Sequence, residues 1–313
     1  MSPPLRIVFM GTPDFAVPSL QTLLDGTDQV VAVVCQPDKR QGRGKISSAP
    51  PIKALATQHG LPVLQPASIR TEHFFEQLRE LAPDLLVVVA YGKILPAPVL
   101  NLPPLGAINV HGSLLPSYRG AAPIQWAVIN GETETGITII QMDEGMDTGD
   151  ILLTAPVSIG PQETAGELFH RLSRLGGETL ENALAQLKKG RLVRTPQDHS
   201  KASNAPMLSK EMGHIDWTLS ARQLHCLIRG LDPWPSAYGY IQGKRCRFFT
   251  PERVLVRATE LPGTICRADN QGLLIATGED CLRIHDIQPE GKKRMPVKTW
   301  LHGSPIKPQT RIT

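Results

Sequence analysis

The 313-residue sequence has few cysteines, few aromatic residues and no long apolar run. Its five cysteines, at 35, 226, 246, 266 and 281, include no CxxC pair, which argues against a disulfide framework or a zinc site. We expect them to be small buried side chains in a reducing compartment. The longest apolar runs, such as 85–90, are far shorter than the roughly 20 residues that cross a bilayer. No signal-like segment is visible, so the sequence predicts a cytoplasmic protein without a membrane partner.

Signatures of several enzyme classes are also missing. The segment 10–15 (MGTPDF) lacks the second and third glycines of a dinucleotide-binding loop. No cysteine or serine stands in an activated setting. The acidic segment 142–150 lacks the spacing and the final glutamate of an EF-hand. These absences disfavour a dinucleotide-dependent oxidoreductase, a covalent enzyme intermediate and a calcium loop.

Short β-branched apolar stretches alternate with helical ones over the first part of the chain. The expected strands are 5–10, 29–35, 85–90, 106–110, 137–142 and 151–158. The expected helices are 15–25, 50–59, 68–81 with Ser68 as N-cap, 121–130, and 163–188 with an interruption at Gly176–Gly177. Almost continuously apolar strands are typical of a parallel sheet that is buried on both faces. We therefore predict an α/β fold with a doubly wound, Rossmann-like domain over residues 1–189.

The composition changes after residue 189. Residues 190–206 are polar without a sustained period, which predicts an inter-domain linker. Short strands at near ten-residue spacing follow from Ser236 onward and predict a smaller β-barrel domain over residues 207–313. That region holds 16 Lys and Arg against 10 Asp and Glu, whereas residues 1–189 hold 14 against 18. The basic excess favours a polyanionic partner for the second domain.

Polar residues gather where expected strands end, which is where ligands bind in open α/β sheets. Asn109 and His111 are two residues apart on one strand, so their side chains project to the same face. Asp147 lies in the acidic loop between two later strands. Each residue alone has an ordinary structural explanation. Together, an amide, an imidazole and a carboxylate without a nucleophile favour direct transfer between two bound substrates.

Seven motifs extend over nearly the whole chain, at 9–20, 36–45, 91–96, 109–127, 136–152, 210–217 and 229–238. The combination Asn-x-His, Ser-Leu-Leu-Pro and Asp-x-Gly-Asp resembles that of the folate-dependent formyltransferases. The basic, glycine-rich segment 36–45 and the motifs of the second domain resemble those of the members that act on tRNA. The resemblance implies an OB-like barrel that holds the acceptor arm of the tRNA.

The resemblance also implies roles for individual residues. Asn109, His111 and Asp147 would be catalytic. The folate pocket would include Ser113, Leu114, Leu115 and Pro116, with Tyr91, Gly92, Ile94 and Leu95 on its pterin side. The tRNA would be contacted by Lys39, Arg40, Arg43 and Lys45.

The reaction implied by the resemblance transfers a formyl group from 10-formyltetrahydrofolate to the α-amine of charged initiator methionyl-tRNA. His111 as an imidazolium and the Asn109 amide would stabilise the oxyanion of the tetrahedral centre. Asp147 would orient the imidazole and assist proton transfer from the attacking amine to the departing nitrogen. Neither a metal nor an obligate protein partner is implied.

Two other functions remain open at this point. A formyltransferase for a small amine, such as glycinamide ribonucleotide or an amino sugar nucleotide, would use the same first-domain motifs. It would leave the basic segment and the basic second domain without a role. A non-catalytic RNA-binding protein on an enzyme scaffold would predict a broken set of catalytic residues, and Asn109, His111 and Asp147 are all present.

Overall fold

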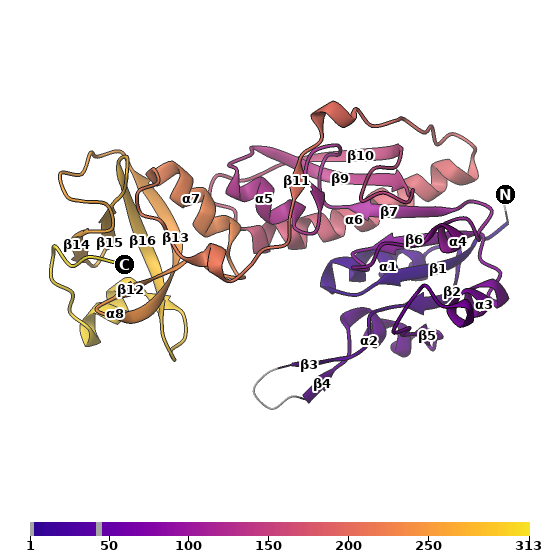
Figure 1. Ribbon diagram of the computed structural model, residues 1–313, viewed down its shortest axis with the longest axis horizontal. Helices are drawn as coiled ribbons and strands as arrows, with labels where there is room; N and C mark the ends of the chain where they lie inside the picture. Colours follow the sequence, from indigo (N-terminus) through magenta and orange to yellow (C-terminus); the bar gives the residue numbers. More distant parts are fainter. Residues whose placement is uncertain (1–2, 42–45) are drawn as a thin grey trace. The chain divides into compact units, whose positions relative to one another are not determined.

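A computed structural model describes residues 3–41 and 46–313. They divide into two compact units (Figure 1). The N-terminal unit consists of Met1–Pro123, Glu134–Ser158 and Phe169–Ala205, and the C-terminal unit consists of Ile124–Thr133, Ile159–Leu168 and Pro206–Thr313. Most of the segment that the sequence suggests as a linker, 190–205, therefore belongs to the N-terminal unit.

A seven-stranded sheet forms the core of the N-terminal unit, in the order β10-β9-β7-β6-β1-β2-β5 (Figure 1). Its strands are β1 (Arg6–Gly11), β2 (Gln29–Val34), β5 (Val63–Leu64), β6 (Leu85–Val89), β7 (Ala107–His111), β9 (Glu134–Gln141) and β10 (Ile151–Ser158). The first five are parallel, whereas β9 runs antiparallel to β7 and to β10. The sheet is thus mixed, and its central strands, the continuously apolar β6 and the neighbouring β7, are buried along their whole length.

Most helices of this unit are close to those expected. They are α1 (Val17–Asp25), α2 (Pro51–Gln58), α3 (Glu72–Glu80), α4 (Ala97–Leu100) and most of α6 (Ala165–Lys188), with the 3-10 turn η1 (Asp14–Ala16) before α1. The prediction of Ser68 as an N-cap is wrong, because Thr71 caps α3 by accepting a hydrogen bond from the backbone N–H of Phe74. A short antiparallel pair, β3 (Lys39–Gln41) and β4 (Ile46–Ser48), precedes α2.

Helix α6 runs without a break through the glycine pair at which the sequence suggested an interruption. A Cβ at Gly177 would lie 2.8 Å from Thr22 Oγ1 and 3.1 Å from the carbonyl oxygen of Pro18. The glycine therefore serves the close packing of α6 against α1 rather than ending the helix.

An antiparallel sheet in the order β12-β13-β16-β15-β14 dominates the C-terminal unit, and β17 pairs with β16. The strands are β12 (Tyr238–Ile241), β13 (Lys244–Val254), β14 (Ile265–Asp269), β15 (Gly272–Ala276), β16 (Cys281–Pro289) and β17 (Met295–Pro296). The helical elements are α5 (Pro123–Ile129), η3 (Glu211–Gly213), α7 (Ala221–Gly230) and α8 (Val297–Gly303). Strand β13 is longer than the short strands that the sequence predicts, because Pro251 within it pairs with Ile284 and the strand runs on for 11 residues.

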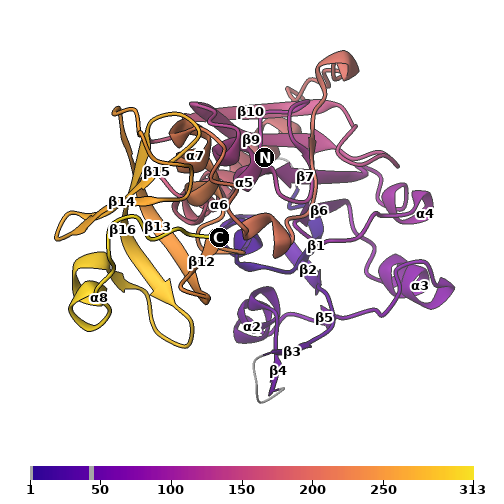
Figure 2. The same cartoon turned by 60° about the vertical axis from the view of Figure 1, so that its left-hand side comes forward.

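The end of the chain joins the two edges of this sheet. The backbone N–H of Tyr240, in β12, donates to the carbonyl oxygen of Thr313, and the N–H of Ile265, in β14, donates to that of Thr310. The C-terminus accordingly lies beside β12 (Figure 2). These bonds close the sheet into a small barrel, which removes exposed strand edges. An α/β domain with a smaller β-barrel domain is thus confirmed.

All five cysteines are free, and four of them are buried, with Cys266 partly exposed. Burial raises the pKa of the Cys35 thiol to about 11, so this side chain stays a neutral, unreactive thiol. Within the described residues, no cluster of three or more His, Cys, Asp or Glu side chains is arranged to hold a metal ion. None of the helices in that part of the chain is long and apolar enough to cross a membrane.

Candidate active site

Strand β7 ends with two buried polar side chains. Asn109 is 9% exposed and His111 is 5% exposed, and β7 lies between β6 and β9. Among the residues that the structure describes, no hydrogen bond occupies the Asn109 side-chain amide. Since a buried amide favours a hydrogen-bond partner, this amide is available to a ligand at the end of the sheet.

His111 lies between two hydrogen-bond acceptors. Its Nε2 is 3.0 Å from the carbonyl oxygen of Tyr118, and since a carbonyl can only accept, Nε2 carries a hydrogen and donates it. Its Nδ1 is 3.6 Å from Asp147 Oδ2. That distance is longer than a direct hydrogen bond and suits a bridging water or a small shift on binding. A proton that arrives on Nδ1 would be stabilised by the carboxylate.

Asp147 lies on a strained turn that is held by hydrogen bonds from a backbone N–H and from the Gln197 side chain. Its φ angle of 54° lies in the left-handed region, which is uncommon outside glycine, asparagine and aspartate. The backbone N–H of Gly120 donates to Asp147 Oδ2 over 2.8 Å. The Gln197 side chain donates to the backbone carbonyl oxygens of Asp147 and Gly149 over 2.8 and 2.7 Å. The carboxylate is thus fixed toward His111 before any substrate binds.

The Ser-Leu-Leu-Pro segment that follows β7 forms a rigid turn. Thr138 Oγ1 donates to the carbonyl oxygen of Ser113 over 2.7 Å and accepts from the N–H of Leu115 over 3.1 Å. Ser113 Oγ donates to the carbonyl oxygen of Ser117 over 2.6 Å. Ser113 and Leu115 are buried, while Leu114 and Pro116 are partly exposed. This segment therefore lies next to His111 as the sequence led us to expect, with two of its four side chains open to a ligand.

The side chains of the segment 91–95 differ in their exposure to solvent. Tyr91 and Leu95 are 2% and 1% exposed and belong to the hydrophobic core under β1 and β6. Burial raises the pKa of the Tyr91 hydroxyl to about 12. Gly92 has a φ of 82°, which turns the chain outward, and Ile94 is 52% exposed. Of the four residues predicted for the pterin side, Ile94 presents an accessible side chain, whereas Tyr91 and Leu95 are buried in the core.

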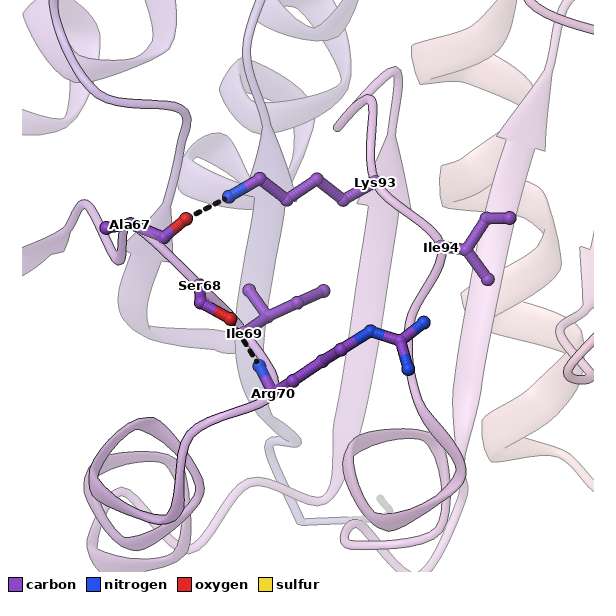
Figure 3. Close-up of a pocket in the computed structure, with 6 residues that line it drawn as sticks. All are labelled: Ala67, Ser68, Ile69, Arg70, Lys93 and Ile94. Atoms are coloured by element: carbon purple, nitrogen blue, oxygen red, sulfur yellow. Dashed lines mark hydrogen bonds between the residues drawn. The ribbon is translucent and has the colours of Figure 1, made fainter.

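Ile94 lines a pocket of about 300 Å³ together with Ala67, Ser68, Ile69, Arg70 and Lys93 (Figure 3). Lys93 Nζ donates across the pocket to the carbonyl oxygen of Ala67 over 2.9 Å. The Arg70 side chain extends toward the loop that carries Ile94 (Figure 3). Arg70 has no carboxylate partner within the described part of the chain. The pocket therefore combines an apolar wall with a cation that is free to meet an anion.

Two of the four predicted tRNA contacts lie on the strand pair β3–β4. Lys39 and Arg40 belong to β3, which is antiparallel to β4. Arg43 and Lys45 lie outside the described residues. The roles of all four remain predictions.

Gln197 is one of the residues near the site that the sequence did not suggest. It lies within 190–206, a segment without hydrophobic period, and a single glutamine in such a segment carries no signal of its own. In the structure it is 6% exposed and bonded to the turn that carries Asp147. Only the folded chain brings these positions together.

Comparison with known proteins identifies similar chains. Residues 5–184 match the family model described as formyl transferase, and residues 207–305 match that of the formyl transferase C-terminal domain. The methionyl-tRNA formyltransferase of Desulfotalea psychrophila is 58% identical over 98% of this chain and 95% of its own length. That of Geobacter sulfurreducens is 49% identical over 98% and 96%.

One solved structure of similar fold is an N-formyltransferase from Helicobacter canadensis in complex with folinic acid and dTDP-3-aminofucose. It aligns with a TM-score of 0.68 at 15% identity, covering 93% of this chain and 100% of that one. At this identity the likeness concerns the fold alone.

Proposed function

The chain belongs to the formyl transferase family, and on that premise we propose that it transfers the formyl group of 10-formyltetrahydrofolate to the α-amine of charged initiator methionyl-tRNA. The observation that carries this function is the full-length similarity to methionyl-tRNA formyltransferases, which extends through both domains. The buried Asn109 amide and His111 imidazole at the end of β7, with the partly exposed Asp147 carboxylate facing His111, supply the chemistry. The product would be the formylated methionyl-tRNA, which would serve translation initiation in the cytoplasm.

The catalytic step follows from the positions of the three side chains. The amine attacks the formyl carbon, a new C–N bond forms, and the bond from that carbon to N10 of the folate breaks. The Asn109 amide presents N–H donors to the formyl oxygen as it gains negative charge. His111 would join it by exchanging the Tyr118 carbonyl, which its Nε2–H meets at 3.0 Å, for that oxygen. Asp147 faces His111 Nδ1 at 3.6 Å and stabilises a proton there. The proton that leaves the amine is delivered to N10 through this pair.

The pocket beside Ile94 supports a folate as the formyl donor. Folates end in a glutamate whose carboxylates are anionic, and the Arg70 guanidinium is suited to pair with a carboxylate. Ile94 supplies an apolar surface at the same pocket. Ser113, Leu114, Leu115 and Pro116 would complete the donor site next to His111, with Tyr91, Gly92 and Leu95 fixing the shape of the wall behind it.

The basic residues support a tRNA acceptor. The C-terminal domain carries 16 Lys and Arg against 10 Asp and Glu, which suits a polyanion. The cations of the segment 36–45 (Lys39, Arg40, Arg43 and Lys45) would contact the acceptor end. Formyl transfer to a small acceptor such as glycinamide ribonucleotide or an amino sugar nucleotide is the competing function, because an N-formyltransferase in complex with dTDP-3-aminofucose has a similar fold.

The test is formyl transfer from 10-formyltetrahydrofolate to charged initiator tRNA, with glycinamide ribonucleotide as a competing acceptor. We expect formylation of the tRNA alone, and a loss of roughly 10²-fold or more in kcat for His111→Ala. Preferential formylation of the small amine would overturn the acceptor. Unchanged activity of His111→Ala would overturn the catalytic site.

A further inference from the structure

We propose that Gln197 is a positioning residue for Asp147, which it holds at the distance from His111 that proton transfer needs. The proposal rests on the proposed function, because it concerns the carboxylate of that reaction. Gln197 reaches neither of the two catalytic side chains that would contact the formyl group. Its effect would pass through the backbone of the Asp147 turn.

The side-chain amide of Gln197 uses both of its hydrogens on this turn. Nε2 donates to the carbonyl oxygen of Asp147 over 2.8 Å and to that of Gly149 over 2.7 Å. The two carbonyls flank Thr148, so one amide restrains three consecutive residues. Asp147 adopts a left-handed φ of 54°, a conformation that persists only where surrounding contacts hold it.

Arg119 sets the orientation of that amide. Its Nη2 and Nε donate to Gln197 Oε1 over 2.6 and 3.2 Å. Because a guanidinium can only donate, Oε1 must face Arg119 and the NH₂ group must face the two carbonyls. The amide therefore has one productive orientation, and at 6% exposure it has little access to competing water.

The short segment 118–120 also contacts two of the three catalytic side chains. Tyr118 accepts from His111 Nε2, Gly120 donates to Asp147 Oδ2, and Arg119 between them binds Gln197. The segment is anchored by the strand pair β8 (Arg119–Gly120) and β11 (Asn204–Ala205), which lies a few residues after Gln197. Residues 118–120 therefore connect His111, Asp147 and Gln197 through direct hydrogen bonds, although 86 positions separate the first of these three from the last.

The chemistry of the contact is specific to glutamine. Glutamate at position 197 has nearly the same shape and still accepts from Arg119, but when ionised it cannot donate to the carbonyls and would repel them. Gln197→Glu therefore removes the restraint on the turn while it preserves the link to Arg119. We expect kcat to fall roughly tenfold or more, because small displacements of catalytic groups are costly. KM for the folate and for the tRNA should stay within about twofold, since Gln197 does not bind substrate.

A double-mutant cycle separates positioning from general structural damage. It compares kcat at saturating substrates for wild type, Gln197→Glu, Asp147→Asn and the double variant. If Gln197 acts through Asp147, its replacement costs little once Asp147 is already neutral, so the losses do not multiply. Gln186→Glu is the control for the chemical change, because Gln186 lies on α6 and its amide donates only to Asn182 at an exposed position. It should keep wild-type kcat.

A well-folded Gln197→Glu enzyme with kcat within twofold of wild type would overturn the proposal, and so would losses that multiply in the cycle. Should Gln197→Glu not fold, Arg119→Met replaces it in the cycle, because it frees the amide to turn away from the carbonyls. A wild-type enzyme that does not formylate the tRNA would refute the proposed function instead. The two failures are therefore distinguishable.

Discussion

Asp147→Asn is expected to abolish most of the activity while leaving the fold intact. Asparagine has the size of aspartate and tolerates the left-handed φ of 54° that this position requires. Its side-chain oxygen can still accept the N–H of Gly120, which lies 2.8 Å from Asp147 Oδ2 in the wild type. What disappears is the negative charge 3.6 Å from His111 Nδ1.

The expected loss in stability is much smaller than the expected loss in rate. A hydrogen bond to a charged acceptor exceeds one to a neutral acceptor by about 1 kcal/mol, so the free energy of unfolding should fall by about that amount. A positioned acid–base group contributes about 10²–10⁴ in rate, which corresponds to about 3–5 kcal/mol in the activation barrier. The rate should therefore respond much more than the stability.

The assay measures kcat and both KM values for wild type, Asp147→Asn and Asp143→Asn. Asp143 is the matched control, because it lies on the same loop, exposed to solvent, and its carboxylate accepts from Gly145 and Thr148. We expect kcat to fall by two orders of magnitude or more for Asp147→Asn and by less than about threefold for Asp143→Asn. The reasoning is refuted if Asp147→Asn stays within about threefold of wild type, or if both variants lose activity equally.

Three further changes test other parts of the structure. Gly136→Ala would place a Cβ 2.3 Å from the carbonyl oxygen of Ala155, so thermal melting should show a loss of about 1–3 kcal/mol, and an unchanged melting temperature would contradict that packing. Deleting residues 41–45 should weaken discrimination between initiator and elongator methionyl-tRNA in a formylation assay, and unchanged discrimination would remove this segment from the acceptor site. Burial and two nearby arginines lower the pKa of His225 from 6.5 to about 4. Because the unfolded chain then binds more protons between these values, stability that is complete above pH 6.5 is lost as the pH falls toward 4. Urea unfolding should show a loss of roughly 2 kcal/mol between pH 7 and pH 5 that His225→Gln lacks; an equal loss in that variant would assign it to other groups.

The sequence by itself determined most of the local elements and singled out the candidate catalytic side chains. Continuously apolar stretches specify buried strands such as β6, because only a doubly covered sheet removes every side chain from water. The two-residue spacing of Asn109 and His111 places both side chains on one face of β7, because strand geometry alternates. The motifs around Asp147 were sufficient to recognise the family. These features depend on residues that are neighbours along the chain.

The tertiary structure decided which of those residues are exposed and what holds them in place. Within the motif 91–96, Ile94 is open to solvent while Tyr91 and Leu95 are in the core, a difference that hydrophobicity alone does not reveal. Helix α6 continues through Gly177 because α1 packs against it. Gln197 reaches a carboxylate turn 50 positions earlier in the chain. Such contacts depend on which distant segments pack together in the folded chain. Local hydrophobic periodicity and turn residues do not predict that packing.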